Sequence, residues 1–242
     1  MAKNHIFHAS DGIEIFYDDL GQGFPIVFLH GNSLSKDYFA NQRVLSQSFR
    51  LILVDSRAHG KSGHNGRQLS FEHMAKDVEE FLSFLAISSC LLVGHSDGAN
   101  LALTYTKYYP ARVGGILFNA GNCRFSDLKL MAQIGIKLEV WGLKLASLLF
   151  SNFKRAYQVA QLMDDDLDLT PLDIHKMTMP VWVLMGENDM VKADTLQELA
   201  EQLPRGRFIN LPHVGHHPAR QCPDDFNDLV LELLTAMERK LV

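Results

Sequence analysis

The chain has 242 residues, a length that fits one large α/β domain or two small ones. Apolar residues make up 47% and charged residues 21% of it, which argues against a disordered, collagen-like or coiled-coil protein. The formal net charge of −5 provides no basic field, so we expect no nucleic-acid partner. Three cysteines without a Cys-x-x-Cys pair argue against a disulfide framework or a thiolate metal site, and they favour a cytoplasmic protein.

Neither the N-terminus nor the most apolar stretch of the sequence predicts export or membrane insertion. The N-terminus has no apolar region followed by a small-residue cleavage site, so no signal peptide is expected. Three lysines and a glutamate interrupt residues 128–150, so no membrane span is expected there.

Along the chain, predicted strands alternate with predicted helices. Asp11 and Gly12 separate two short β-like runs, the pattern of an antiparallel hairpin. The solid apolar runs that follow are typical of buried parallel strands. These runs are residues 26–29, 51–54, 91–93, 116–118 and 181–185. Apolar residues from Met74 to Leu85 recur at helical spacing behind Ser70, a predicted N-cap. The alternation predicts a doubly wound α/β sheet covered on both faces, with ligands beyond the carboxyl ends of its strands.

Residues 122–176 break this alternation, because they have helical periodicity and no strand run. We interpret them as a helical cap inserted into a core of residues 1–121 and 177–242. The apolar residues of the cap are expected mostly to pack on the core, with some lining a pocket. They are Leu130, Ile134, Leu138, Trp141, Leu145, Leu148 and Leu149.

The motif with the clearest chemical meaning is GHSDG at residues 94–98. It directly follows a strand run and directly precedes a helical pattern, the context in which a Gly-x-Ser-x-Gly turn presents a nucleophilic serine. Ser96 is expected at a strained turn with positive φ, where Gly94 and Gly98 let the strand and helix backbones pass closely. The alternative, a turn that merely links strand to helix, is disfavoured by this placement.

A serine nucleophile needs a base and a group that orients the base. Candidates of both kinds follow later strand runs: Glu187, Asp189, His213, His216 and His217. The histidines have no cysteine or carboxylate beside them at a familiar ligand spacing, so no metal is expected. A glycine-lysine-serine run at residues 60–62 resembles the end of a P-loop, but Asp55 occupies the position of the required glycine. We therefore expect no cofactor.

Several motifs together resemble the α/β-hydrolase superfamily, specifically its single-domain serine hydrolases with a short helical cap. The resemblance covers nearly the whole chain. It rests on residues 29–32 (LHGN), 55–62 (DSRAHGKS), 94–98 (GHSDG), 109–113 (YPARV), 186–190 (GENDM) and 215–216 (GH). It implies an α/β-hydrolase fold: a doubly wound, mostly parallel sheet with an N-terminal antiparallel hairpin and an inserted helical cap.

The resemblance also implies roles for individual residues. Ser96 would be the nucleophile, His216 the general base and then acid, and Asp189 the group that orients the histidine. The backbone N–H groups of Asn32 and Asp97 would form the oxyanion hole.

At two positions the pattern of the family distinguishes one residue from its neighbours. His216 is preferred to His213 and His217 because the family places its histidine directly after a glycine. Asp189 is preferred to Glu187 because the acid of the family stands three residues after the strand-ending Gly186. His95 and His30 are expected to be structural.

The implied activity is acyl transfer, and we expect a carboxylic ester hydrolase acting on a small, partly hydrophobic ester-like substrate. A serine at the turn argues against epoxide opening and dehalogenation, whereas thioesters, lactones, amides, C–C bonds and perhydrolysis stay open. An acidic Asp97 that faces the pocket would favour cationic substrates, but the favoured interpretation is that its side chain points away into a hydrogen bond or salt bridge.

The alternative from another class is a small-molecule receptor or signalling protein of the same fold, with slow or single-turnover hydrolysis. It is disfavoured because the sequence has no evident interaction tail or exposed apolar segment. Protein partners and oligomeric state are not predicted.

Overall fold

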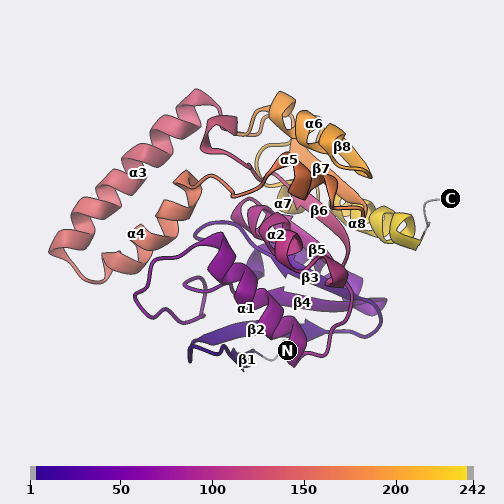
Figure 1. Ribbon diagram of the computed structural model, residues 1–242, viewed down its shortest axis with the longest axis horizontal. Coiled ribbons are helices and arrows are strands. Elements are labelled where there is room, and N and C mark those ends of the chain that lie inside the picture. The colour runs from indigo at the N-terminus through magenta and orange to yellow at the C-terminus, as the bar shows by residue number, and fades with distance from the viewer. Residues whose placement is uncertain (1–3, 239–242) are drawn as a thin grey trace.

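The structure is a computed structural model that describes residues 4–238 of the chain. Its strands form one eight-stranded sheet in the order β1-β2-β4-β3-β5-β6-β7-β8 (Figure 1). β2 pairs antiparallel with β1 and β4, and all other neighbouring pairs are parallel. The strands are β1 (His5–His8), β2 (Glu14–Leu20), β3 (Pro25–Leu29), β4 (Arg50–Val54), β5 (Cys90–His95), β6 (Val113–Asn119), β7 (Val181–Gly186) and β8 (Gly206–Leu211).

Local sequence signals set the positions of these strands. The predicted hairpin forms between β1 and β2, where Gly12 has a φ of +83° and His8 pairs with Glu14. Each of the five predicted apolar runs lies within one of the strands β3 to β7. The prediction of a doubly wound, mostly parallel sheet with an N-terminal antiparallel hairpin is confirmed.

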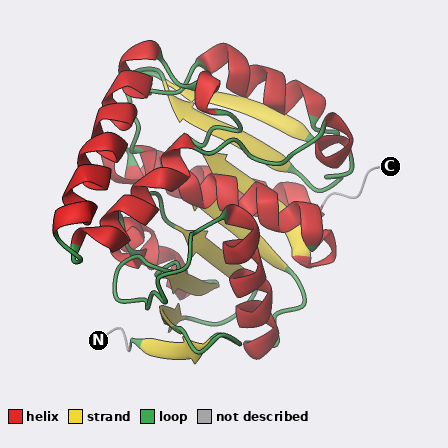
Figure 2. Ribbon diagram, turned by 60° about the vertical axis from the view of Figure 1, so that its left-hand side comes forward, coloured by secondary structure: helices red, strands yellow, loops and turns green. Residues whose placement is uncertain are grey.

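Helices cover both faces of the sheet (Figure 2). Val27 and Leu29 of β3 pack in one apolar cluster with α1, α2 and α6, whereas Ile26 and Phe28 pack in a second cluster with η1, α7 and α8. This alternation follows from the two-residue period of a strand. The helices are α1 (Phe71–Phe84), α2 (Asp97–Tyr108), α6 (Ala193–Gln202), α7 (Pro218–Gln221), α8 (Pro223–Glu238) and the 3₁₀ helices η1 (Lys36–Gln47) and η2 (Pro110–Arg112). Ser70 caps α1 as predicted, since its side chain accepts a hydrogen bond from the backbone N–H of His73.

The chain between β6 and β7 forms helices: η3 (Phe125–Asp127), α3 (Leu130–Leu149), α4 (Phe153–Gln161), η4 (Leu162–Asp164) and α5 (Pro171–His175). α3 and α4 project as a hairpin from one end of the molecule, in pink and salmon at the left of Figure 1. Within residues 4–238, no helix combines the length and the apolar character that crossing a membrane requires.

The seven apolar residues of α3 that the sequence predicts mostly to pack on the core are exposed instead, and only Ala132 and Ile136 of the helix's apolar residues pack partly against it. No residue of α3 is buried, and Trp141 is 62% and Leu148 75% exposed. The cause is the projecting position of the α3–α4 hairpin, which gives α3 neighbours on one side only. The expectation that no apolar segment is exposed is therefore also wrong. α4, by contrast, buries Val159 and Ala160.

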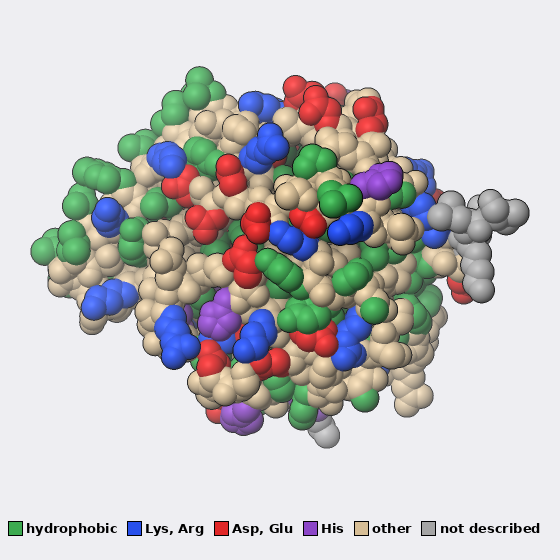
Figure 3. Space-filling model, viewed as in Figure 1, with side chains coloured by type: hydrophobic (Ala, Val, Ile, Leu, Met, Phe, Trp, Pro, Cys, Tyr) green, Lys and Arg blue, Asp and Glu red, His purple; other side chains and the backbone are tan. Residues whose placement is uncertain are grey.

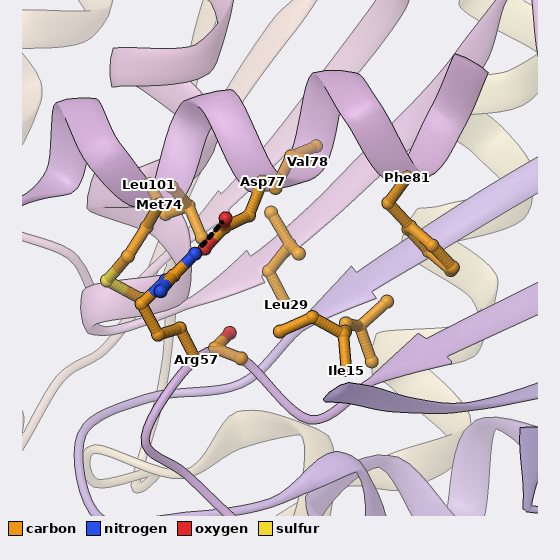
Figure 4. A pocket seen from close by; sticks show the side chains of 10 residues that line it. Ile15, Leu29, Arg57, Met74, Asp77, Val78, Phe81 and Leu101 are labelled. Atoms are coloured by element: carbon orange, nitrogen blue, oxygen red, sulfur yellow. Dashed lines mark hydrogen bonds and ion pairs between the residues drawn. The ribbon is translucent and has the colours of Figure 1, made fainter. Parts of the chain in front are cut away.

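A small internal cavity lies under α1 beside a buried ion pair (Figure 4). Arg57 donates hydrogen bonds of 2.5 and 2.6 Å to Asp77 and of 2.7 Å to Asp11. The cavity measures about 20 Å³, which is room for about one water molecule. It is too small for a substrate, and the ion pair fixes the loop after β4 to α1.

Candidate active site

Ser96 stands between the last residue of β5 and the first residue of α2. Its φ of 52° and ψ of −121° are costly for a residue with a side chain. A Cβ atom on Gly98 would lie 1.9 Å from the carbonyl oxygen of Leu29, and one on Gly94 would lie 2.3 Å from that of Gly98. Both positions therefore require glycine, as the motif predicts. The N–H of Ser96 donates to the carbonyl of Asn119 at 2.9 Å, which ties the turn to β6.

Three side chains from separate loops meet at this edge of the sheet. The Nε2 atom of His216 lies 3.3 Å from the Oγ atom of Ser96, and its Nδ1 atom lies 2.8 Å from an oxygen of Asp189. An Nδ1–H that donates to Asp189 leaves Nε2 free to accept the serine proton, which is the tautomer that general-base catalysis needs. The structure thus brings together the three residues that the sequence predicts.

The loops after β7 and β8 hold the carboxylate and the imidazole in place. The Asp189 side chain is 0% exposed, and one of its oxygens accepts a hydrogen bond of 3.1 Å from the N–H of Val191. A Cβ atom on Gly186 would lie 2.3 Å from the carbonyl oxygen of Gly215, so the two loops touch at backbone level. Lys129, just before α3, donates to the carbonyl of Asp189 at 2.6 Å. The N–H of Val191 thus holds the carboxylate, and Lys129 holds the backbone of the same residue.

The neighbouring candidates lie outside this arrangement. The Glu187 carboxylate accepts a hydrogen bond of 2.8 Å from the N–H of His213, and the two side chains are 52% and 94% exposed. His217 points instead into the elbow, where its Nδ1 atom lies 3.2 Å from the Nε2 atom of His95. The choice of residue 216 over 213 and 217 therefore agrees with the geometry.

Buried aromatic side chains pack beneath the turn that carries Ser96, and the sequence predicts only one of them, His95. His95 is buried as expected, and the ring of Tyr38 stacks on it at a centroid distance of 4.3 Å. The Nδ1 atom of His95 lies 3.1 Å from the side-chain nitrogen of Asn119, which leaves Nε2–H to donate to His217. Burial, with smaller contributions from neighbouring cations, lowers the pKa of His217. No sequence signal predicts that Tyr38 or His217 contacts His95, because these contacts arise only from folding.

The loop after β3 passes directly over the nucleophile. A Cβ atom on Gly31 would lie 3.0 Å from the Cβ atom of Ser96. The Nε2 atom of His30 accepts from the N–H of Ser56 at 3.1 Å, so its Nδ1–H donates to the carbonyl of Gly31 at 2.8 Å. Burial lowers the pKa of His30 to about 4, which keeps the imidazole neutral. His30 therefore braces this loop, in line with its expected structural role.

Asn32 and Asp97, the two predicted oxyanion-hole residues, are linked by their side chains. The Asn32 amide donates to the Asp97 carboxylate at 2.8 Å and to the carbonyl of Val159 in α4 at 2.7 Å. The N–H of Asp97 lies in the first turn of α2, where an α-helix supplies no acceptor. Burial raises the pKa of Asp97 to about 6, although the Asn32 hydrogen bond opposes the shift. The Asp97 side chain thus makes a hydrogen bond, as the favoured interpretation expects, but the residue also lines the cavity described next.

A cavity of about 330 Å³ opens above these groups. Ser96, Asp97 and His216 line its floor, and Ile136 and Glu139 of α3 line its other side. This volume lies at the lower end of the range for small-molecule sites. Across residues 4–238, no group of three or more His, Cys, Asp or Glu side chains is arranged to hold a metal ion.

Comparison with known proteins identifies the family. A sequence profile of the alpha/beta hydrolase family matches residues 26–229. The chain belongs to this family. This alpha/beta hydrolase is 37% identical over 105 residues to a non-heme haloperoxidase of Rhodococcus erythropolis, a match that covers 43% of the chain and 38% of that relative. It is 24% identical to the AB hydrolase superfamily protein YisY of Bacillus subtilis (strain 168), over 94% of this chain and 98% of the relative.

Solved structures show the same fold around a different sequence. An esterase from Exiguobacterium antarcticum superposes on this alpha/beta hydrolase with a TM-score of 0.83 and 20% identity, over 96% of this chain and 100% of that chain. The family resemblance inferred from the motifs is confirmed.

Proposed function

We propose that this alpha/beta hydrolase is a serine hydrolase that cleaves carboxylic esters by acyl transfer. The observation that carries the proposal is the chain of contacts from Asp189 through His216 to Ser96, at the floor of a cavity of substrate size. A buried carboxylate, an imidazole and a hydroxyl in this order are the components of a serine nucleophile and its base.

In the proposed reaction, the Oγ atom of Ser96 attacks the ester carbonyl while its proton passes to Nε2 of His216. Asp189 stabilises the imidazolium that forms, and the N–H groups of Asn32 and Asp97 donate to the tetrahedral oxyanion. The imidazolium then gives its proton to the departing alcohol, which leaves an acyl group on Ser96. Water that is deprotonated by His216 attacks this acyl-enzyme, and the acid leaves as the serine is restored.

The cavity supports a small, partly hydrophobic substrate. Leu128, Ile136, Met163 and Met190 contribute apolar surface to its lining. We propose that residues 122–176 act as a cap, because Ile136 and Met163 reach the cavity from this insertion.

The test is hydrolysis of p-nitrophenyl esters of graded acyl length at neutral pH by the wild type, by Ser96→Ala and by the control Ser126→Ala, a surface serine in η3. Ser96→Ala should lose about 10³ to 10⁶ in kcat, and Ser126→Ala should match the wild type. Mass spectrometry after a rapid quench should find the acyl group on the wild type and not on Ser96→Ala. A wild type no faster than Ser96→Ala on every ester would overturn the proposal.

The receptor alternative has one observation in its favour, the exposed apolar residues of α3. It predicts release of about one equivalent of nitrophenol per protein and no steady turnover, whereas the hydrolase predicts continuing turnover after the first equivalent.

A further inference from the structure

The side of α3 that points away from the molecule carries an apolar stripe. Six of its residues stand alternately three and four positions apart, a spacing that aligns side chains along one side of an α-helix. They are Met131, Ile134, Leu138, Trp141, Leu145 and Leu148, and each is between 43% and 77% exposed. We call these six residues the outer face of α3. Single exposed apolar residues are ordinary, but a continuous line of them marks an interaction surface.

This surface continues around the tip of the hairpin. Leu149, Phe150 and Phe153 are exposed beside the end of α3, and Figure 3 shows apolar side chains gathered over this end of the molecule, with Lys and Arg between them. A helix of 20 residues is about 30 Å long. The apolar surface is therefore a long, narrow strip rather than a compact pocket.

The charge of this segment is opposite to that of the whole chain. Residues 129–155 contain Lys129, Lys137, Lys144, Lys154 and Arg155 against one acid, Glu139, which gives a net charge of +4 in a chain of net charge −5. Lys137 pairs with Asp164, Lys129 donates to the carbonyl of Asp189, and Arg155 donates to the carbonyls of Ala58 and Gly60. Among residues 4–238, no carboxylate pairs with Lys144 or Lys154. Lys144, within α3, and Lys154, at the start of α4, therefore carry uncompensated positive charge near the outer face of α3.

The apolar stripe and the nearby lysines together distinguish between two partners that this face of α3 could bind, a second copy of the chain and a lipid surface. A second copy of the chain would bring the cations of both copies to one interface, and like charges across an interface weaken association. A helix with Trp, Phe and Leu on one face and Lys on its flanks suits the boundary between lipid head groups and acyl chains. Anionic head groups would also neutralise the cations, and each Lys or Arg near such a surface is favourable.

We propose that the outer face of α3 binds the surface of a membrane that contains anionic lipids. The helix lies in the plane of the interface, with Trp141 and Leu138 among the acyl chains and Lys144 among the head groups. Because a helix in this position lies on the membrane and does not span it, binding is reversible and depends on salt.

The opposite side of α3 connects this surface to the proposed active site. Ile136 lies two residues from Ile134, about 200° around the helix, and lines the cavity above Ser96. α3 therefore stands between the proposed membrane surface and the nucleophile. Resting on the proposed ester hydrolysis, this position assigns an amphiphilic ester held in the lipid surface as the substrate class.

Binding is measured without hydrolysis by using the full chain with Ser96→Ala. Vesicles of phosphatidylcholine with about one third phosphatidylserine should co-sediment with the protein, and vesicles of phosphatidylcholine alone should do so more weakly. Trp141→Glu should weaken binding about tenfold or more, because it replaces apolar contact by a negative charge. Val44→Glu is the matched control: Val44 is 53% exposed on η1, far from α3 in the sequence, and its substitution should leave binding unchanged.

Tryptophan fluorescence supplies a second readout at the same residue. The chain has two tryptophans, and Trp182 is only 6% exposed in β7. In a Trp182→Phe background, anionic vesicles should shift the Trp141 emission to shorter wavelength. The proposal fails if wild type and Trp141→Glu bind anionic vesicles equally. It also fails if Trp141→Glu instead converts a wild-type dimer to a monomer in sedimentation velocity while neither protein binds vesicles.

A hydrolysis arm separates this inference from the proposed function. Trp141→Glu should keep the wild-type rate on a soluble nitrophenyl ester and lose rate on a fluorogenic ester embedded in anionic vesicles. Vesicle binding by Ser96→Ala with no ester hydrolysis by the wild type would overturn the proposed function and support the membrane surface. Hydrolysis of soluble esters by a protein that does not bind vesicles would support the proposed function and overturn the membrane surface.

Discussion

The carboxyl group of Asp97 links the pH of the medium to the stability of the fold. It is 5% exposed between the nucleophile turn and the loop after β3, and burial raises its pKa from 3.8 to about 6. Between these two values the folded protein binds more protons than the unfolded chain, so this group makes stability fall as pH rises. The shift in pKa lowers the free energy of unfolding by about 3 kcal/mol when the group is charged. This destabilisation is complete above about pH 6 and absent below about pH 4.

Asp97→Asn removes this charge and keeps an oxygen that can accept from the Asn32 amide. The unfolding free energy of the variant minus that of the wild type should therefore increase by about 3 kcal/mol from about pH 4 to about pH 7. Urea unfolding across this range measures the difference, in which the other titrating groups cancel. Ser96→Ala, which retains the Asp97 carboxyl, should follow the wild type. A difference that stays constant with pH would refute the reasoning.

Three further changes test other parts of the structure. Asp189→Asn should keep the fold and lower kcat for ester hydrolysis about 10³- to 10⁴-fold, because an amide no longer fixes the tautomer of the neighbouring histidine; a loss below about tenfold would exclude Asp189 as the orienting acid. Gly98→Ala should abolish soluble expression, since its Cβ atom would lie 1.9 Å from a carbonyl oxygen of β3. Gly135→Ala is the matched control, because Gly135 has open space around it in α3, and it should stabilise the protein by about 0.5 to 1 kcal/mol in thermal melts. Similar effects of the two would contradict the packing of the elbow. Arg57→Met leaves Asp77 buried without its cation and should cost about 3 to 5 kcal/mol in urea unfolding at neutral pH, and a cost below about 1 kcal/mol would argue against the buried ion pair.

The sequence predicts the structure well where the residues that restrict the backbone lie within one short segment. The GHSDG segment predicts the elbow because two glycines and a strained serine are needed within five residues of the same turn. Gly186 marks the loop that carries Asp189 for a similar reason, since a side chain there would collide with the loop that carries His216. Parallel strands end at one edge of the sheet, so residues that follow successive strands converge.

Contacts between distant segments could not be predicted in this way. The stacking of Tyr38 on His95, and the Asn32 amide shared by Asp97 and the carbonyl of Val159, join residues that no local pattern relates. Their partners depend on which loops the folded sheet brings together.

The sequence by itself determined the strand order along the chain, the nucleophile turn and the family, because backbone sterics and apolar periodicity act over a few residues. Only the tertiary structure decided what covers each apolar face. The periodicity of α3 is the same whether the helix is buried or exposed, and it was the projection of the α3–α4 hairpin from the sheet that left Trp141 and Leu148 facing outward. Burial depends on the arrangement of whole layers, which no segment of the chain specifies alone.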